Sequence, residues 1–210
     1  YFVIENGDRI AFAGKNGEGK TTMIRIIIGE LDHTGKAKTG HNVKIGYFAQ
    51  NQDEKLNPSK TVLETLDDAA VGEVRKRLRD ILGQFLFHGD DVHKKVSVLS
   101  GGERSRLALA KLMLEPHNFL ILDEPTNHLD ILSKDRLKKA LQQFTGTLIV
   151  VSHDRDFLDG LSDRIFEFEN KTIKKHGGNM SRFIKKIKQK QADYNRPKSS
   201  SEKNENPDAR

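Results

Sequence analysis

The sequence predicts an α/β fold with a mostly parallel sheet core, a small antiparallel β part and a helical subdomain. Short, continuous apolar runs at 119–122, 147–151 and 165–168 alternate with helical segments such as 131–144. This alternation is typical of parallel strands that helices cover on both faces. A glycine-rich loop, 14–21, also joins an apolar run to a helical pattern. The 210 residues, of which 35% are hydrophobic and 31% charged, are enough for one large compact unit.

The first predicted elements surround the glycine-rich loop. We expect 3–4 and 10–13 to form a short β-hairpin whose second strand leads into the loop. Apolar residues then recur from 19 to 29 in the pattern of a buried helix. The alternating run 43–48 predicts another strand. Strand, glycine loop and helix therefore follow one another in the order that a phosphate-binding loop needs.

The middle of the chain reads as mainly helical. Helical patterns cover 61–83 and 101–115, with a charged, turn-rich break at 88–95 between them. We therefore expect a helical subdomain at about 60–115, inserted between the strands of one α/β unit that extends over 1–180.

The two ends of the chain differ in charge. Residues 1–170 hold 24 Lys and Arg against 26 Asp and Glu, whereas 171–210 hold 12 against 4. We expect a basic helix at 181–194 and a flexible polar tail at 195–210, because the tail has almost no apolar residues. The basic end suggests a contact with a polyanion such as RNA, and a solvated amphipathic helix is the alternative.

Composition also limits the cellular setting. The sequence has no run of about 18 apolar residues that could span a bilayer, and its first residues do not resemble a signal peptide. It contains no cysteine, which fits a reducing compartment. We therefore predict a cytoplasmic protein without a membrane span. Because the chain starts without Met and within an apolar pattern, we also expect it to be a piece of a longer polypeptide.

The loop 14–21 matches G-x-x-x-x-G-K-[ST] between a predicted strand and a predicted helix. Backbone N–H groups of such a loop converge on phosphate oxygens at a helix N-terminus. We expect Lys20 to bridge the β- and γ-phosphates of a nucleotide and the Thr21 hydroxyl to bind Mg²⁺. The alternative is an ordinary glycine-rich turn. The predicted phosphate contacts of this loop are Gly14, Asn16, Gly17, Gly19, Lys20, Thr21 and Thr22.

Two adjacent carboxylates, Asp123 and Glu124, end the buried run 119–122. Since neighbouring residues of a strand point in opposite directions, we assign the two side chains different roles. Asp123 is expected to hold Mg²⁺, and Glu124 to polarise or deprotonate the attacking water. The alternative is a strand followed by an acidic turn.

A third motif, Ser100-Gly101-Gly102-Glu103, has the spacing of a helix-capping box. Two glycines in a first helical turn cost about 1 kcal/mol each relative to alanine, which makes sense where bare backbone approaches a phosphate. We therefore predict that Ser100, Gly101 and Gly102 form an anion site that faces outward. The alternative is a helix cap with no further role. Because the glycine-rich loop and the carboxylates Asp123 and Glu124 could already hold a nucleotide, this motif implies a second copy of the site.

Two single polar residues follow predicted strands. Gln50 comes after 43–48, and His153 comes after 147–151. Taken alone, they are a surface amide and a loop histidine. Beside a nucleotide, Gln50 could reach Mg²⁺ or the water, and His153 could donate a hydrogen bond to the γ-phosphate.

These motifs in this order resemble an ATP-binding cassette (ABC) nucleotide-binding domain, a P-loop NTPase fold. Within that superfamily, 123–130 (DEPTNHLD) and 152–158 (SHDRDFL) resemble the F subfamily, which are soluble twin-cassette ATPases that act on ribosomes. Transporters commonly have Gln at the position of Glu103, so this Glu also resembles the F subfamily. The patterns at 41–48 and 178–183 look like those that flank its second, C-terminal cassette. Lys15 departs from the usual Pro, and the adenine-stacking aromatic of the family lies upstream of this chain.

The resemblance implies a set of ligands, partners and roles. ATP and Mg²⁺ are the implied cofactors, and the implied partners are a second cassette, in the same polypeptide or in a homodimer, and the ribosome or its RNA. It implies that Ser100 and Gly102 bind the γ-phosphate held by the partner cassette and that Asp130 crosses to the opposite site. Glu124, His153 and Lys20 are then the catalytic residues.

Three functions are consistent with these motifs. The first is an ATPase cassette of a ribosome-associated translation factor. The second is the ATP-binding subunit of an ABC transporter, which shares the same catalytic residues. The third, an ATP-binding scaffold that barely hydrolyses, is disfavoured because Glu124, His153 and Ser100 are all present.

Overall fold

The centre of the molecule is a six-stranded sheet. In this computed structural model, which describes residues 2–49 and 52–194, the strands are β1 (Arg9–Gly14), β2 (Ile45–Phe48), β3 (Phe119–Asp123), β4 (Thr147–Val151), β5 (Arg164–Glu169) and β6 (Thr172–Gly177). Their spatial order is β2-β3-β4-β1-β5-β6. All neighbours are parallel except β5 and β6, which are antiparallel. The predicted mostly parallel sheet with a small antiparallel part is confirmed.

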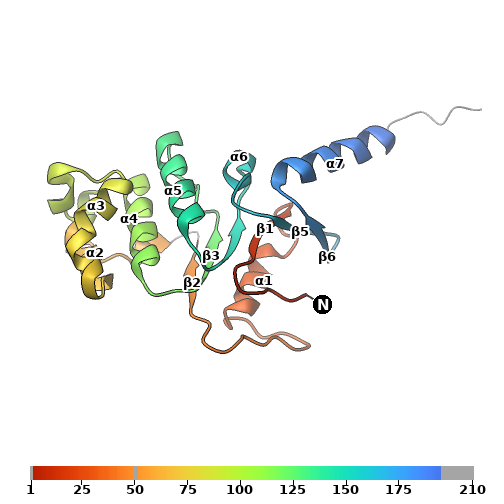
Figure 1. Cartoon of the computed structure of the whole chain (residues 1–210), viewed down its shortest axis with the longest axis horizontal. Helices are drawn as coiled ribbons and strands as arrows, with labels where there is room; N and C mark the ends of the chain where they lie inside the picture. The colour runs from red at the N-terminus through yellow and green to blue at the C-terminus, as the bar shows by residue number, and fades with distance from the viewer. Residues whose placement is uncertain (1, 50–51, 195–210) are drawn as a thin grey trace, which may run out of the picture.

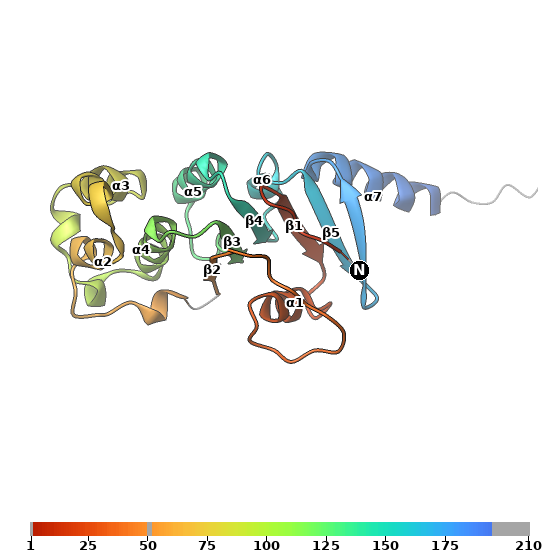
Figure 2. The same cartoon turned by 60° about the horizontal axis from the view of Figure 1, so that its bottom comes forward.

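Seven α-helices accompany the described strands. They are α1 (Lys20–Ile27), α2 (Val62–Ala69), α3 (Leu78–Gln84), α4 (Gly101–Leu114), α5 (Ile131–Gln143), α6 (Arg155–Leu158) and α7 (Met180–Tyr194), with 3-10 segments at Gln52–Lys55, Gly72–Arg77, Gly89–His93 and Val96–Val98. Figure 2 shows α1 under one face of the sheet and α5 and α6 over the other. The helices α2, α3 and α4 gather beside the β2 edge, and α7 lies at the opposite end of the molecule (Figure 1).

Strand residues alternate between two apolar cores, one on each face of the sheet. Ile10 and Phe12 of β1 pack with Ile24 of α1. Ala11, between them, belongs to the larger core that includes Leu137 of α5 and residues of α2, α3 and α4. Because side chains in a strand point alternately to the two faces, one apolar run supplies both cores.

The predicted hairpin of 3–4 with 10–13 is wrong. Residues 3–4 are not in a strand, whereas β1 is bonded to β4 on one side and β5 on the other. Both hydrogen-bonding edges of β1 are therefore occupied, which leaves no edge for a hairpin partner. The antiparallel pair is instead β5 with β6, a strand that the sequence reading did not single out.

The predicted single helix over 61–83 is also wrong, because the chain breaks in its middle. Thr61 and Glu64 form a capping box at the start of α2, which ends at Ala69. Gly72 then has a φ of 66°, in the left-handed region that an α-helix does not use, and a 3-10 segment leads into α3. The helices predicted from 19–29, 101–115 and 131–144 are confirmed as α1, α4 and α5.

Two further expectations concern regions outside the core. None of the helices within residues 2–49 and 52–194 has the length and apolar character needed to cross a bilayer. The tail predicted at 195–210 lies outside the described residues.

Candidate functional site

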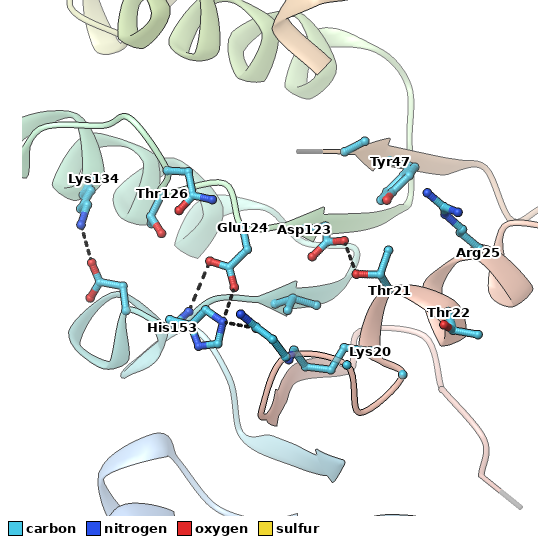
Figure 3. A pocket seen from close by; sticks show the side chains of 17 residues that line it. Lys20, Thr21, Thr22, Arg25, Tyr47, Asp123, Glu124, Thr126, Lys134 and His153 are labelled. Atoms are coloured by element: carbon cyan, nitrogen blue, oxygen red, sulfur yellow. Dashed lines mark hydrogen bonds and ion pairs between the residues drawn. The ribbon is translucent and has the colours of Figure 1, made fainter. Parts of the chain in front are cut away.

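The loops that follow β1, β3 and β4 meet at one edge of the sheet. Parallel strands place their carboxyl ends together, and ligands of such folds bind there. Because β4 lies between β1 and β3, His153 emerges between the glycine-rich loop and the carboxylates. Together these loops line a cavity of about 840 Å³ (Figure 3). The lining residues are Asn16, Gly17, Gly19, Lys20, Thr21, Thr22, Arg25, Tyr47, Ala49, Asp123, Glu124, Thr126, Asn127, Lys134, Val151, His153 and Asp154.

Glycine is required at the point where β1 enters the loop. A Cβ on Gly14 would lie 2.4 Å from the carbonyl oxygen of Phe168, and the φ of Gly14 is 143°. Gly19, at the N-cap of α1, has a φ of 98°. Among the described residues no side chain caps this helix, so the first N–H groups of α1 remain available to an anion.

The Lys20 side chain lies at the base of the loop. It is buried, and its Nζ donates hydrogen bonds to the carbonyl oxygens of Gly14 at 2.8 Å and Lys15 at 2.9 Å. The loop therefore holds a positive charge next to the helix N-terminus, as phosphate binding requires.

Thr21 and Asp123 form a pair of oxygen ligands. The Thr21 hydroxyl donates to Asp123 Oδ2 at 2.9 Å across the cavity wall (Figure 3). Burial raises the pKa of Asp123, and the hydrogen bond from Thr21 and the positive charge of Lys20 partly offset that effect. The described residues contain no cluster of three or more His, Cys, Asp or Glu that could hold a metal. Two hard oxygen donors fit Mg²⁺, which commonly takes its other ligands from phosphates and water.

The backbone leaves the extended conformation of β3 at Glu124. Its φ is 52°, and its backbone N–H donates to the carbonyl of Val151 at 2.8 Å. Both Asp123 and Glu124 line this cavity, so strand alternation does not place one of them away from the site. The alternation rule holds only within a strand, and β3 ends at Asp123.

The Glu124 carboxylate is half-buried and lies against His153. Its Oε2 accepts from the His153 backbone N–H at 3.4 Å, and His153 Nε2 lies 3.4 Å from Oε1. Within the described part of the chain, Oε1 has no hydrogen-bond partner although it is buried. Burial is the main cause that raises the pKa of Glu124, while the nearby His153 lowers it. Oε1, which takes part in no hydrogen bond within the described residues, is suited to accept a proton or a hydrogen bond from a water molecule.

His153 connects the two sides of the cavity. Its exposed ring places Nε2 3.0 Å from Oδ1 of Asn16, in the glycine-rich loop. With a proton on Nε2, the ring donates to this loop and stands where a terminal phosphate could be sensed.

The predicted outward-facing motif lies apart from this cavity. Ser100 caps α4: its Oγ accepts from the Glu103 N–H at 3.3 Å, and Glu103 Oε2 accepts from the Ser100 N–H at 2.8 Å. A Cβ on Gly102 would lie 2.8 Å from the His128 carbonyl oxygen, whereas one on Gly101 would meet nothing within 4 Å. The motif is therefore a real helix cap with an open backbone edge, and none of Ser100, Gly101 and Gly102 lines the cavity.

Asp130 also lies outside the cavity, at the N-cap of α5. Its Oδ1 accepts from the Ser133 N–H at 2.7 Å, and its Oδ2 lies 3.8 Å from Nη1 of Arg106. These contacts lower the pKa of Asp130, mainly through the bonds from Ser133. The structure thus divides the predicted residues that it describes into a group that shares the cavity and a group on α4 and the start of α5. Gly14, the last residue of β1, is in neither group, because it does not line the cavity.

One predicted site residue is not tested by the structure, and several residues that line the cavity were not predicted from the sequence. Gln50 lies outside the described residues, although its neighbour Ala49 lines the cavity. The missed lining residues are Arg25, Tyr47, Ala49, Thr126, Asn127, Lys134, Val151 and Asp154. Two signals could have found some of them: Asp154 directly follows His153, and Lys134 stands one helical turn after Asp130.

Comparison with known proteins shows which family the chain resembles. The family model described as ABC transporter matches residues 1–127. The chain is 47% identical over 186 residues to the ATP-binding protein YdiF of Bacillus subtilis (strain 168), a match that covers 88% of this chain and 29% of YdiF. It is 44% identical over 185 residues to ABC transporter F family member 5 of Arabidopsis thaliana, covering 87% of this chain and 27% of that protein. The chain thus spans less than a third of the length of these relatives.

Solved structures share the fold. One, described as the dimeric structure of a post-hydrolysis state of an ATP-binding cassette bound to ADP and Pi, aligns with a TM-score of 0.68 at 22% identity and covers 84% of this chain and 88% of that chain. Another is a chain from a structure described as ribosome-bound archaeal Pelota and ABCE1. It aligns with a TM-score of 0.71 at 28% identity over 88% of this chain and 33% of that chain.

Proposed function

Since the chain belongs to the ABC transporter family of ATP-binding cassettes, we propose that it binds and hydrolyses ATP at the cavity between the glycine-rich loop and Glu124. The observation that carries this proposal is the position of Glu124. Its buried Oε1, which has no hydrogen-bond partner within the described residues, lines the same cavity as Lys20 and Thr21. A carboxylate with an open oxygen beside a phosphate-binding loop is the arrangement that directs water at a terminal phosphate.

The remaining residues have separate roles in this proposal. The N–H groups of Gly17, Gly19 and the first turn of α1 bind phosphate oxygens, and Lys20 leaves its carbonyl partners to neutralise them. Thr21 and Asp123 would hold Mg²⁺, which would supply positive charge to the phosphate oxygens. His153 contacts the γ-phosphate, and its ring also lies next to the Glu124 carboxylate, so phosphate binding affects the position of both side chains.

A second cassette completes the site. We propose that Ser100, Gly101 and Gly102 contact the ATP held by a partner cassette, in the same polypeptide or in a homodimer, and that Asp130 reaches toward that site. Two observations support this: these residues lie outside the cavity of their own chain, and the Gly101 edge of α4 is open. One molecule of ATP would then be enclosed by two cassettes arranged head to tail.

For the whole protein, we propose an F-type cassette, the second of a twin, acting in a ribosome-associated translation factor of the cytoplasm. The name of the Arabidopsis relative supports the subfamily, and the similarity to a chain from the ribosome-bound Pelota and ABCE1 structure supports the setting. We propose the ATP-binding unit at 1–180, the basic helix at 181–194 and the polar tail at 195–210 as its parts. The alternative is the ATP-binding subunit of a transporter, which the description of the family model favours.

The decisive experiment replaces Glu124 with Gln. Glu124→Gln keeps the shape of the side chain and removes its capacity to accept a proton, so ATP binding is retained and turnover falls by about 100-fold or more. Glu73→Gln, an exposed carboxylate in the 3-10 segment before α3, is the matched control. Equilibrium binding of ATP and steady-state phosphate release are measured on both variants. Parental turnover in Glu124→Gln would contradict the proposed role of Glu124.

A further inference from the structure

The loop that carries His153 is tied to α5 by one ion pair. Lys134 Nζ lies 2.7 Å from Oδ2 of Asp154, the residue after His153 (Figure 3). The two side chains are only 34% and 25% exposed, so water screens this pair less than it screens a pair on the open surface. Both residues line the cavity, at its wall beyond Glu124.

Asp154 is itself fixed by its neighbours. Its backbone N–H donates to Ser152 Oγ at 3.1 Å, and its Oδ1 accepts from the N–H of Phe157 at 3.0 Å as the N-cap of α6. Ser152 Oγ lies 3.0 Å from the hydroxyl of Thr126, and both residues are buried. The carboxylate that Lys134 contacts is therefore held by hydrogen bonds within the loop, directly next to His153.

The other end of this connection is the first turn of α5. Asp130 caps the helix one turn before Lys134, and Ser133 Oγ accepts from Arg106 Nη1 of α4 at 3.1 Å. The first turn of α5 thus contacts the helix that begins with Ser100 on one side and the His153 loop on the other. Lys134 is the residue of that turn that reaches the loop.

We propose that Lys134 is a positioning residue of the reaction, which acts through Asp154 to hold His153 and Glu124 in the geometry that hydrolysis needs. This inference rests on the proposed ATPase function. Its Nζ is bonded to Asp154, so the proposed role acts through that carboxylate. The backbone N–H of His153 donates to Glu124, so a displaced loop would also displace the carboxylate. Small displacements of a catalytic group reduce rate much more than they reduce binding.

The test compares three lysine substitutions. Lys134→Met removes the ion pair and is expected to lower kcat by about tenfold or more with KM for ATP changed less than about twofold. Lys134→Arg, which can still contact Asp154, restores most of kcat. Lys139→Met is the control, because it removes an ion pair with Asp135 on the exposed part of the same helix and leaves kcat unchanged.

Asp154→Asn provides an independent variant, since Asn can still cap α6 but loses the charge that Lys134 binds. Alone it is expected to lower kcat as Lys134→Met does, and the double variant is expected to be no slower than either single variant. Unchanged kcat in both single variants, additive losses in the double variant, or an increase in KM alone would overturn the proposal. The proposed function fails separately: it fails if the parent chain, assembled with its second cassette, does not hydrolyse ATP or if Glu124→Gln does not slow it.

Discussion

Glu124 combines two features that each cost stability. Its φ of 52° lies in a region that non-glycine residues rarely occupy, at a cost of about 1–3 kcal/mol. Its carboxylate is also partly buried, with one oxygen that lacks a hydrogen-bond partner in the described part of the chain. Strain and incomplete solvation at the same residue are typical of functional sites, where catalysis is favoured over stability.

The raised pKa of Glu124 predicts the acid side of the pH–rate profile. The carboxylate works only when it is ionised, so activity is lost as the pH falls through its pKa. Because burial moves this pKa above the ordinary value of 4.5, the loss begins at a higher pH than for an exposed Glu. The measurement is kcat against pH at saturating Mg²⁺ and ATP. An acid limb at or below 4.5 would contradict this prediction.

The same shift predicts a stability difference with a definite sign. A carboxyl whose folded-state pKa is raised destabilises the fold where it is ionised, and this penalty disappears as the pH falls through that pKa. Glu124→Gln is therefore expected to have a higher Tm than the parent near neutral pH, and the difference is expected to shrink on acidification. Thermal unfolding of both proteins at several pH values checks this. A variant that is less stable than the parent at neutral pH would contradict the assignment of burial as the main cause.

At the residue scale, motifs were predictable from sequence and orientations were not. The positions of Lys20, Thr21 and Asp123 in one cavity follow from strand ends that share an edge. The direction of Glu124 depends on a bond between its N–H and the carbonyl of Val151 in β4, a contact between segments far apart in the sequence. Lys134 was missed for the same reason, since its partner Asp154 lies on another element.

At the element scale, α2 and α4 begin with the same device. Thr61 with Glu64 and Ser100 with Glu103 are both capping boxes. Each Glu side chain accepts from the N-cap, and these bonds lower the pKa of both carboxylates. The two caps have the same hydrogen-bond pattern, but only the cap of α4 is proposed to face a second nucleotide.

Because the two caps are alike, comparing variants of both distinguishes a structural role of Ser100 from a role in ATP turnover. Thr61→Ala and Ser100→Ala each remove a cap and are expected to destabilise the fold by about 1 kcal/mol. Only Ser100→Ala is expected to lower ATP turnover, because Thr61 has no proposed contact with a nucleotide. Denaturant unfolding and steady-state ATPase assays on both variants test this. Equal loss of turnover in the two variants would show that the cap of α4 acts through stability alone.

Hydrophobic periodicity in the sequence did not predict all boundaries of the helices and strands. The capping box at Ser100 predicted the start of α4, because a cap is a local hydrogen-bond pattern. The break near Gly72 was missed because helical periodicity does not register the left-handed φ of that glycine. The strand predicted at 3–4 was wrong because both edges of β1 are occupied by β4 and β5, a tertiary arrangement. The strand β6 carries few apolar residues, so its pairing with β5 gave a weak signal in the sequence.

At the scale of the whole molecule, the two surfaces proposed to bind partners, the start of α4 and the helix α7, lie toward opposite ends. The helices α2, α3 and α4 gather beside β2, whereas α7 lies beyond the β5 and β6 end (Figure 1). The α7 helix packs Phe183, Ile184 and Ile187 on the larger core and exposes basic residues on its other side. Since 1–170 is almost neutral, the basic excess is confined to this end of the chain.

A proposed contact of α7 with RNA can be tested by the salt dependence of binding. Replacing Lys185, Lys186 and Lys188 with Gln removes three exposed charges without changing the apolar side of the helix. If each lysine contacts a phosphate, the slope of log affinity for ribosomes against log salt concentration becomes shallower by about 2–3 units. The matched control replaces Lys36, Lys38 and Lys44, which are exposed and lie in the almost neutral part of the chain, and it leaves the slope unchanged. Equal slopes for the parent and the α7 variant would instead show that α7 is a solvated amphipathic helix, because lost phosphate contacts must release fewer counterions.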